Sequence, residues 1–265
     1  MRTSNRVFFG QMTCFSKCSV SRAALLGLAL GCATEALAQV TSINSAVITP
    51  RVFNDVPGAT FFPVNQYPSA VSLSEFGVSA PTGYANRDVW QFSNNGTAPY
   101  QFQNNDYFNA SFTLTLLGFP ISPRKEAGFL FSTASQGDIQ FVVNTDGHEV
   151  VQFGGISFYS FNANNGMTYN SGDAITLGMR YFMDGNGDNA LQFSANGVTS
   201  PVFDFAPGAG IGNGSTLGGY LQVQNDPSNP GNGGQAIFQH IVIPEPGTLS
   251  LLSLGVGAFL LRRRN

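Results

Sequence analysis

The chain has 265 residues, of which only 10% are charged, and it contains 31 Gly and 24 Phe. So low a charged content excludes coiled coils and charged disordered tails. Twelve Lys and Arg against 15 Asp and Glu give a net charge of −3, with no basic stripe that would neutralise phosphates. We therefore expect a folded protein with no nucleic-acid partner.

Residues 1–38 have the organisation of a secretory signal peptide. Four basic residues precede an apolar run at 23–33, and a small-x-small cleavage pattern follows at Ala36, Ala38 and Gln39. The run is too short to cross a bilayer comfortably as a helix. We predict a signal helix that signal peptidase removes after Ala38.

Two alternatives remain for this N-terminal segment. Residues 28–32 loosely resemble a lipobox, which would make the protein a lipoprotein acylated at Cys32, although Ala29 stands where Leu is usual. A buried core helix is the other alternative.

The C-terminal residues 244–265 form a second separate unit. It consists of a proline-bounded motif at Pro244, Glu245 and Pro246, an apolar stretch at 248–261 and a basic cluster at Arg262, Arg263 and Arg264. The prolines interrupt any preceding helix or strand. The terminal arginines are expected to stay on the cytoplasmic side of a membrane. At 14 residues the stretch is short for a membrane span.

This order of Pro-Glu-Pro, apolar helix and arginine cluster resembles the PEP-CTERM sorting signal, also catalogued as an ice-binding-protein C-terminal domain. The resemblance implies a transmembrane helix that holds the protein in the inner membrane until an exosortase, a membrane cysteine transpeptidase, cuts near Pro-Glu-Pro. The protein would then reach the cell surface or extracellular matrix of a bacterium with an outer membrane. The catalogue name gives no warrant for ice binding, and an ordinary C-terminal anchor is the alternative.

Residues 39–243 form the predicted exported domain. All three Cys precede it, so no disulfide supports the fold, which must rely on its core alone; 20 of the 24 Phe fall within this domain. Its five basic and 13 acidic residues give a net charge of −8. Such a charge favours an uncharged glycan or a cation-linked role.

Period-two alternation of apolar residues predicts an all-β domain. It recurs, without any long helical pattern, at 89–92, 111–116, 128–131, 139–143, 150–153, 175–179, 191–193, 201–205, 220–223 and 236–242. Turn dipeptides at 95–96, 146–147 and 196–197 support hairpins. We predict a two-sheet antiparallel β-sandwich of jelly-roll type. The last strand, 237–243, resembles the closing strand of concanavalin-like and laminin-G-like sandwiches.

Few residues carry recognisable catalytic chemistry. With only His148 and His240, and no Cys in the domain, a zinc enzyme is not expected. There is no Gly-x-Ser-x-Gly elbow for a serine hydrolase. The Glu-x-Asp-x-x-Glu pattern of sandwich glucanases is absent too, and Glu75, Glu126 and Glu149 each lack a partner two or four residues away.

One loop has a composition suited to calcium. Asp184, Asn186 and Asp188 place oxygen ligands at alternate positions between glycines. The loop is not an EF-hand, because Ala195 stands where a bidentate Glu is required. A hairpin tip without metal is the alternative, and no other cofactor is expected.

The sequence thus predicts a non-catalytic, exosortase-processed surface protein associated with exopolysaccharide. Amide and aromatic side chains at 100–104 are expected on a solvent-facing strand, where they would contact sugar. A glycan-active enzyme and a calcium-dependent adhesion module are the alternative functions.

Overall fold

A computed structural model describes residues 43–243. The predicted signal helix, the cleavage site at Ala36, Ala38 and Gln39, and the sorting segment 244–265 with its transmembrane helix lie outside these residues. Within the described part, no helix is long and apolar enough to cross a membrane.

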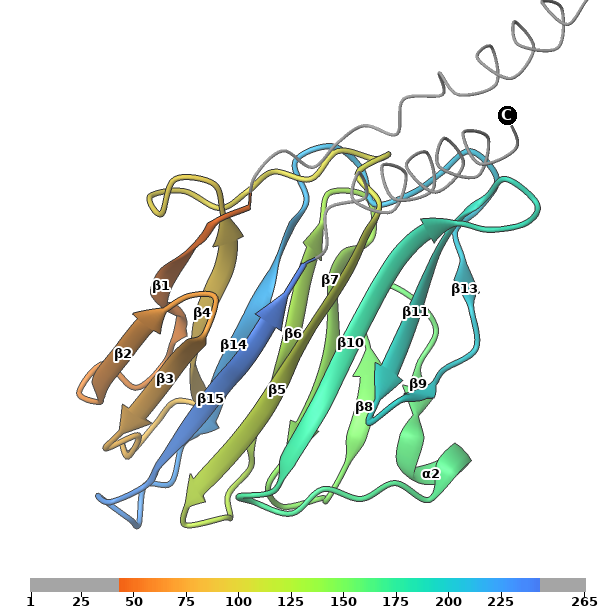
Figure 1. The fold of residues 1–265 in the computed structure, drawn as a ribbon. Coiled ribbons are helices and arrows are strands. Elements are labelled where there is room, and N and C mark those ends of the chain that lie inside the picture. The colour runs from red at the N-terminus through yellow and green to blue at the C-terminus, as the bar shows by residue number, and fades with distance from the viewer. Residues whose placement is uncertain (1–42, 244–265) are drawn as a thin grey trace, which may run out of the picture. The chain divides into compact units, whose positions relative to one another are not determined.

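Two antiparallel sheets pack face to face, which confirms the predicted all-β sandwich (Figure 1). The seven-stranded sheet has the order β1 (Ser45–Asn54), β4 (Ala85–Ser93), β14 (Thr216–Gln224), β6 (Lys125–Thr133), β7 (Gly137–Asn144), β8 (Val150–Phe153) and β9 (Tyr159–Ser160). The eight-stranded sheet has the order β12 (Val198–Thr199), β11 (Asn189–Ala195), β10 (Ala174–Met183), β5 (Phe108–Phe119), β15 (Gly233–Val242), β3 (Ala70–Phe76) and β2 (Thr60–Gln66), with β13 (Phe203–Asp204) paired to β11.

The core lies between the sheets and is largely aromatic. Trp90 of β4 makes edge contacts with Phe112 of β5 and Phe238 of β15, and the ring centroids of Phe112 and Phe129 are 4.1 Å apart. Gly219 of β14 is needed here, because a Cβ on it would lie 2.5 Å from Trp90 Nε1. Burying each such aromatic side chain contributes about 1.5–3 kcal/mol, which supports a fold without disulfides.

The segments predicted from period-two alternation all coincide with strands, but the structure adds strands that alternation did not indicate. These are β1, β2, β3, β9 and β12. A five-residue helix, α2 (Phe161–Asn165), begins at the N-cap Ser160, whose hydroxyl accepts from the Ala163 amide at 3.1 Å.

The predicted turns have different outcomes. Asn196 and Gly197 have φ values of 47° and 82° between β11 and β12, as a tight hairpin requires. The hairpin predicted at Asp146-Gly147 is present, since β7 and β8 pair antiparallel, but its tight two-residue turn is wrong. There, Asn144 Oδ1 accepts from the Gly147 amide at 2.9 Å, the connection is longer, and the positive φ of 54° occurs at His148.

The predicted solvent-facing strand at 100–104 is also wrong. This segment makes a single bridge, from Phe102 to Ser215, and the Phe102 ring is fully buried against Tyr100 and Phe108. Phe102 therefore contributes to the core, and 100–104 offers no flat strand to a sugar.

Candidate functional site

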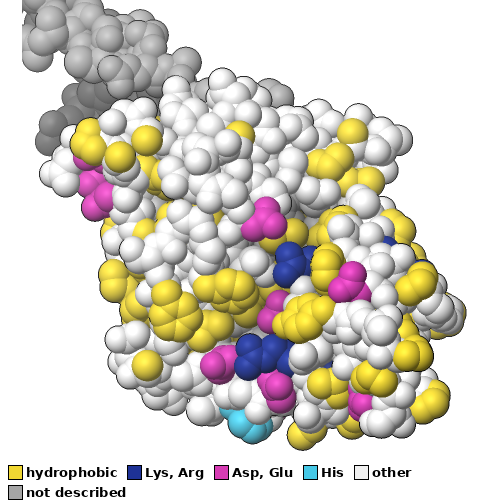
Figure 2. All heavy atoms as spheres, turned by 180° about the vertical axis from the view of Figure 1, so that it is seen from behind, with side chains coloured by type: hydrophobic (Ala, Val, Ile, Leu, Met, Phe, Trp, Pro, Cys, Tyr) yellow, Lys and Arg dark blue, Asp and Glu magenta, His cyan; other side chains and the backbone are white. Residues whose placement is uncertain are grey.

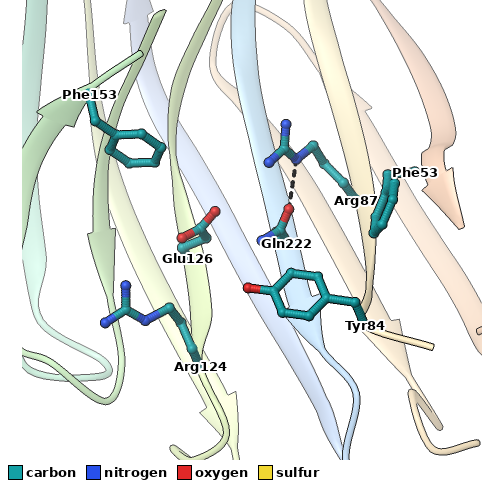
Figure 3. Close-up of a pocket in the computed structure, with 7 residues that line it drawn as sticks. All are labelled: Phe53, Tyr84, Arg87, Arg124, Glu126, Phe153 and Gln222. Carbon is teal, nitrogen blue, oxygen red and sulfur yellow. Dashed lines mark hydrogen bonds between the residues drawn. The ribbon is translucent and has the colours of Figure 1, made fainter. Parts of the chain in front are cut away.

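A hollow of about 430 Å³ opens on the outer face of the seven-stranded sheet. Figure 2 views the molecule from this side and shows basic and acidic side chains gathered among hydrophobic ones. Its lining residues come from strands far apart in the sequence: Phe53, Tyr84, Arg87, Arg124, Glu126, Phe153 and Gln222. We call this hollow the groove (Figure 3).

Strand pairing places the groove floor in one row across four strands. Arg87 of β4 is opposite Phe53 of β1 on one side and Gln222 of β14 on the other, and Gln222 is opposite Glu126 of β6. Directly paired residues of antiparallel strands point to the same face. The floor is thus fixed by sheet register rather than by loops.

Arg87 provides an unpaired positive charge in this row. Its Nε donates to Gln222 Oε1 at 2.8 Å, and its guanidinium carbon lies 4.9 Å from the centroid of the Tyr220 ring. No carboxylate of residues 43–243 lies within 4.0 Å of it. The two terminal nitrogens, held in a fixed plane, are the donors that suit a bidentate contact with an anion.

Tyr220 and Glu126 form a buried polar pair beneath the groove. The Tyr220 hydroxyl lies 3.0 Å from Glu126 Oε1 and 2.8 Å from Gln140 Oε1. Burial raises the pKa of Glu126, against the lowering effect of the Tyr220 hydrogen bond, and burial raises the pKa of Tyr220 well above its ordinary value. Tyr220 therefore stays protonated and acts as a donor.

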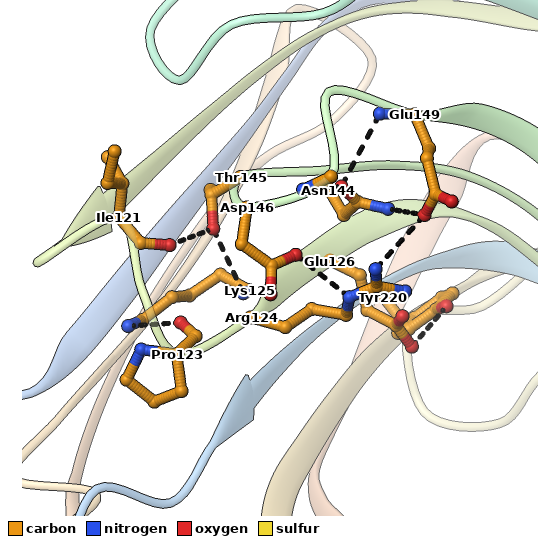
Figure 4. A network of polar contacts seen from close by, with 11 residues as sticks. Ile121, Pro123, Arg124, Lys125, Glu126, Asn144, Thr145, Asp146, Glu149 and Tyr220 are labelled. Carbon is orange, nitrogen blue, oxygen red and sulfur yellow. Dashed lines mark hydrogen bonds and ion pairs between the residues drawn. The ribbon is translucent and has the colours of Figure 1, made fainter. Parts of the chain in front are cut away.

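The other end of the groove is closed by an ion-pair network (Figure 4). Arg124 Nε lies 2.9 Å from Asp146 Oδ1, and its Nη2 lies 3.1 Å from Glu149 Oε2. Asn144 Nδ2 donates to the same Glu149 oxygen at 2.5 Å. The charge of Arg124 is thus balanced within the protein, unlike that of Arg87.

Aromatic rings form the two sides of the groove. Phe53 and Tyr84 lie on the β1 and β4 side, and Phe153 lies on the β8 side (Figure 3). Phe53 is 40% exposed and Tyr84 is 55% exposed. Exposed rings around convergent polar groups are typical of a binding site for an amphipathic ligand.

The loop predicted to bind calcium lies elsewhere, at the hairpin tip between β10 and β11. Asp184 Oδ1 accepts from the amides of Asn186 and Asp188, both at 2.9 Å, and its Oδ2 accepts from Asn186 Nδ2 at 2.9 Å. These bonds engage both oxygens of the expected first ligand. Among residues 43–243, no group of three or more His, Cys, Asp or Glu is placed to hold a metal ion.

The structure separates the other candidate residues. His148 is exposed on the β7–β8 connection, as predicted, and His240 is exposed at a bulge in β15. Glu126 lies in the groove, Glu149 lies in its closing network, and Glu75 is fully buried between the sheets.

Sequence reasoning missed Arg87 and Tyr220. A signal for both was available, since alternation in 86–92 places Arg87 on the face opposite Trp90, and alternation in 220–223 places Tyr220 on the face opposite Leu221. The sequence does not reveal that β14 pairs with β4 and β6. This pairing brings Arg87 and Tyr220 onto the same face of one sheet.

Comparison with known families identifies the C-terminal segment. Residues 242–264 match the PEP-CTERM protein-sorting motif, and the match begins at the last residue of β15. This confirms the predicted PEP-CTERM sorting signal at the C-terminus, whose assignment to Pro244, Glu245 and Pro246 stays a prediction. The motif implies an exported protein that an exosortase processes at the membrane and that reaches the surface.

Comparison of the whole chain with curated proteins gives no match. Among solved structures, it is similar to an alginate lyase from Corynebacterium sp., with 12% identity and a TM-score of 0.46 over 77% of this chain and 94% of that one. It is also similar to the alginate lyase AlyA1 from Zobellia galactanivorans, with 8% identity and a TM-score of 0.44 over 70% and 80%. The carbohydrate binding module CBM66 from Bacillus subtilis gives 10% identity and a TM-score of 0.38 over 72% and 96%. Such identities and scores transfer no activity to this chain.

Proposed function

We propose that the sandwich is a non-catalytic, polysaccharide-binding component of the exopolysaccharide layer, and that the groove binds an acidic glycan. The observation that carries this proposal is Arg87, a guanidinium at the groove floor with no carboxylate partner among the described residues. In a domain of net charge −8, a guanidinium in a hollow with no described carboxylate within 4.0 Å favours an anionic ligand over a cationic one, although the charge of Arg87 also acts on Glu126 in the same groove.

The aromatic sides support a sugar rather than a small inorganic anion. Phe53, Tyr84 and Phe153 present apolar ring faces, while Gln222 and Glu126 provide polar groups between them. A pyranose ring has apolar C–H faces and hydroxyl edges, so it can pack on rings and hydrogen-bond to the floor at the same time.

The arrangement of ionisable groups supports binding without hydrolysis. Glycoside hydrolysis requires two carboxyl groups across the scissile bond, and Glu126 is the only carboxylate among the groove-lining residues. Tyr220 is fully buried, so its hydroxyl is a poor candidate for proton transfer to a ligand. A glycan-active enzyme is the competing proposal, and a calcium-dependent adhesion module through Asp184, Asn186 and Asp188 is favoured by no contact in the structure.

Further proposals concern the two terminal segments and the class of the sandwich. We assign residues 1–38 to a signal peptide cleaved before Gln39, and 248–261 to a helix that anchors the chain in the inner membrane before exosortase cleavage. We also assign the sandwich to the concanavalin-like jelly-roll class. This assignment is supported by the insertion of the late strands β14 and β15 into the middle of the two sheets.

A glycan array of neutral and acidic polysaccharides tests the proposal on the exported protein starting at Gln39. We expect acidic glycans to bind and Tyr84→Ala or Phe153→Ala to weaken their binding at least tenfold. Phe62→Ala is the matched control, because Phe62 is an equally exposed ring, 56% accessible, on the other sheet. An array with no bound glycan would overturn the proposal, and release of oligosaccharides during incubation would favour the enzyme.

A further inference from the structure

A second cluster of ionisable groups lies directly behind the wall of the groove, between the sheets. Its members are Arg51 of β1, Glu75 of β3 and Asp88 of β4, with Asn86 of β4 beside them. Glu75, Asn86 and Asp88 are all fully buried. Burying a carboxylate costs desolvation free energy unless the group is paired and hydrogen-bonded.

The contacts satisfy only one oxygen of each carboxyl group. Glu75 Oε1 accepts from Asn86 Nδ2 at 2.8 Å and lies 3.3 Å from Arg51 Nη2. Asp88 Oδ1 accepts from the Arg51 backbone amide at 2.8 Å. Glu75 Oε2 and Asp88 Oδ2 receive no hydrogen bond from any other described group.

With both carboxyl groups ionised, the pair and Arg51 together would carry a net charge of −1. Among residues 43–243, Arg51 is the only cation in contact with the pair. The residues paired with Asp88 and Glu75 in the adjoining strands are Leu221, Gly234 and Phe61, which do not titrate. The buried Lys125 of β6 instead donates to the Pro123 carbonyl at 2.7 Å. A proton held between the carboxyl groups would satisfy both remaining oxygens and reduce the net charge to zero.

Electrostatics agree with this geometry. Burial first, and then the charge of Glu75, raise the pKa of Asp88 to about 8, while the Arg51 amide and guanidinium oppose the rise. Two buried carboxyl groups that contact the same arginine and act on each other cannot both ionise at little cost.

We propose that Asp88 and Glu75 share one proton, and that this proton stabilises the bulged segment of β1 in its folded position. When the proton is released to solvent, the β1 side of the groove opens. The bulge lies between Thr49 and Phe53. Arg51 has a φ of 53° there, which interrupts the regular ladder. The segment is held instead by the contacts of Arg51 with the pair and with the Pro57 and Ala59 carbonyls.

The consequence for the groove follows from the sequence neighbours. Phe53 follows Arg51 by two residues and lines the groove, and Arg87 directly precedes Asp88. Opening of the bulge would move Phe53 and leave Arg87 without one wall. This consequence rests on the proposed function, whereas the proton-dependent stabilisation of the bulged segment does not.

The sign of the pH dependence follows from linkage. In an opened segment the carboxyl group returns toward its ordinary pKa near 4, so opening releases a proton at any pH between that value and about 8. The opening equilibrium therefore increases as pH rises through this window and levels off above it.

Hydrogen exchange with mass spectrometry on the exported protein, from Gln39, tests the proposal without any glycan. Protection factors, which divide out the intrinsic pH dependence, are measured for the peptide 50–55 at pH 5 and pH 8. We expect a decrease of at least tenfold in the wild type. Asp88→Asn keeps the acceptor for the Arg51 amide but holds no titratable proton, so its protection should change less than twofold.

The matched control is Asp204→Asn, the same chemical change at an exposed position on β13, which should behave as the wild type. Glu75→Gln is a second test of the pair, should Asp88→Asn not fold. A wild-type protection factor that stays constant from pH 5 to pH 8 would overturn the proposal, as would an unchanged slope in either folded variant. If neither variant folds, the wild type alone decides. A decrease in protection factor confined to residues 50–55 supports the proposal, and an equal decrease in β7 overturns it. Absence of glycan binding leaves all these outcomes unaffected.

Discussion

Tyr220 is the residue through which the floor of the groove is most directly tested. Tyr220→Phe keeps the fully buried ring and removes only the hydroxyl that lies 3.0 Å from Glu126 Oε1 and 2.8 Å from Gln140 Oε1. No other hydrogen bond to the Glu126 carboxylate is present among the described residues, so the substitution leaves that nearly buried group without a donor. A hydrogen bond to a charged group is worth about 1.5–3 kcal/mol.

We therefore expect Tyr220→Phe to lower the free energy of unfolding by about 2 kcal/mol at pH 7. For a domain of this size each kcal/mol corresponds to a shift in Tm of about 2–4 °C, which predicts a decrease of roughly 4–8 °C. Because the Tyr220 hydrogen bond lowers the pKa of Glu126, its loss should raise that pKa further. The penalty should consequently diminish at acid pH, where Glu126 is protonated in both proteins.

Urea denaturation at several pH values between 4 and 8 measures this difference. Tyr84→Phe is the matched control, because the Tyr84 ring is exposed and its hydroxyl makes no hydrogen bond within residues 43–243. A Tyr220→Phe variant as stable as the wild type at pH 7 would refute the reasoning. So would a loss of stability of the same size at every pH, since it would arise from packing rather than from Glu126.

Three further predictions concern other parts of the chain. Gly128→Ala should destabilise the fold by at least about 2 kcal/mol in the same denaturation assay, because its Cβ would lie 2.1 Å from the Phe141 carbonyl oxygen; an unchanged midpoint would contradict this. Millimolar calcium should shift Tm by less than about 1 °C, because the Asp184 oxygens are already hydrogen-bonded, whereas a calcium-dependent rise abolished by Asp184→Asn would revive the calcium site. Deleting 244–265 should abolish surface display and processing, detected by fractionation and immunoblotting; unchanged localisation would contradict the sorting assignment.

The sequence predicted the strands whose two faces differ in polarity. Alternation located the core-forming parts of β4 to β8, β10, β11, β14 and β15, because one face of each packs between the sheets. In β6, β8 and β14 the other face is largely buried too, and a second apolar cluster of Val89, Leu130, Val142, Val151 and Tyr220 lies outside the main core. Alternation failed for β2, in which six of seven residues are exposed and Pro63 interrupts the pattern. It failed for β1 because the bulge at Arg51 breaks the period of two.

The site was less accessible to prediction than the fold. Arg87, Glu126 and Tyr220 belong to segments separated by tens of residues, and only the pairing order β4–β14–β6 places them in adjacent rows. The bulk charge of −8 pointed to an uncharged or cation-linked partner, because a sum over the domain does not show that Arg87 lacks a partner while Arg124 has two. The sorting signal, in contrast, is contiguous in the sequence, so its family could be predicted without knowledge of strand pairing.

The central claim is that the groove binds an acidic polysaccharide through Arg87. Isothermal titration calorimetry with oligogalacturonate, and with the same oligosaccharide after reduction of its carboxyl groups, measures this most directly. The account predicts that the wild type prefers the acidic form at least tenfold and that Arg87→Gln removes this preference, since a charge-assisted hydrogen bond contributes about 1.5–3 kcal/mol. Equal affinity of the wild type for both forms, or an Arg87→Gln variant that retains the preference, would contradict it.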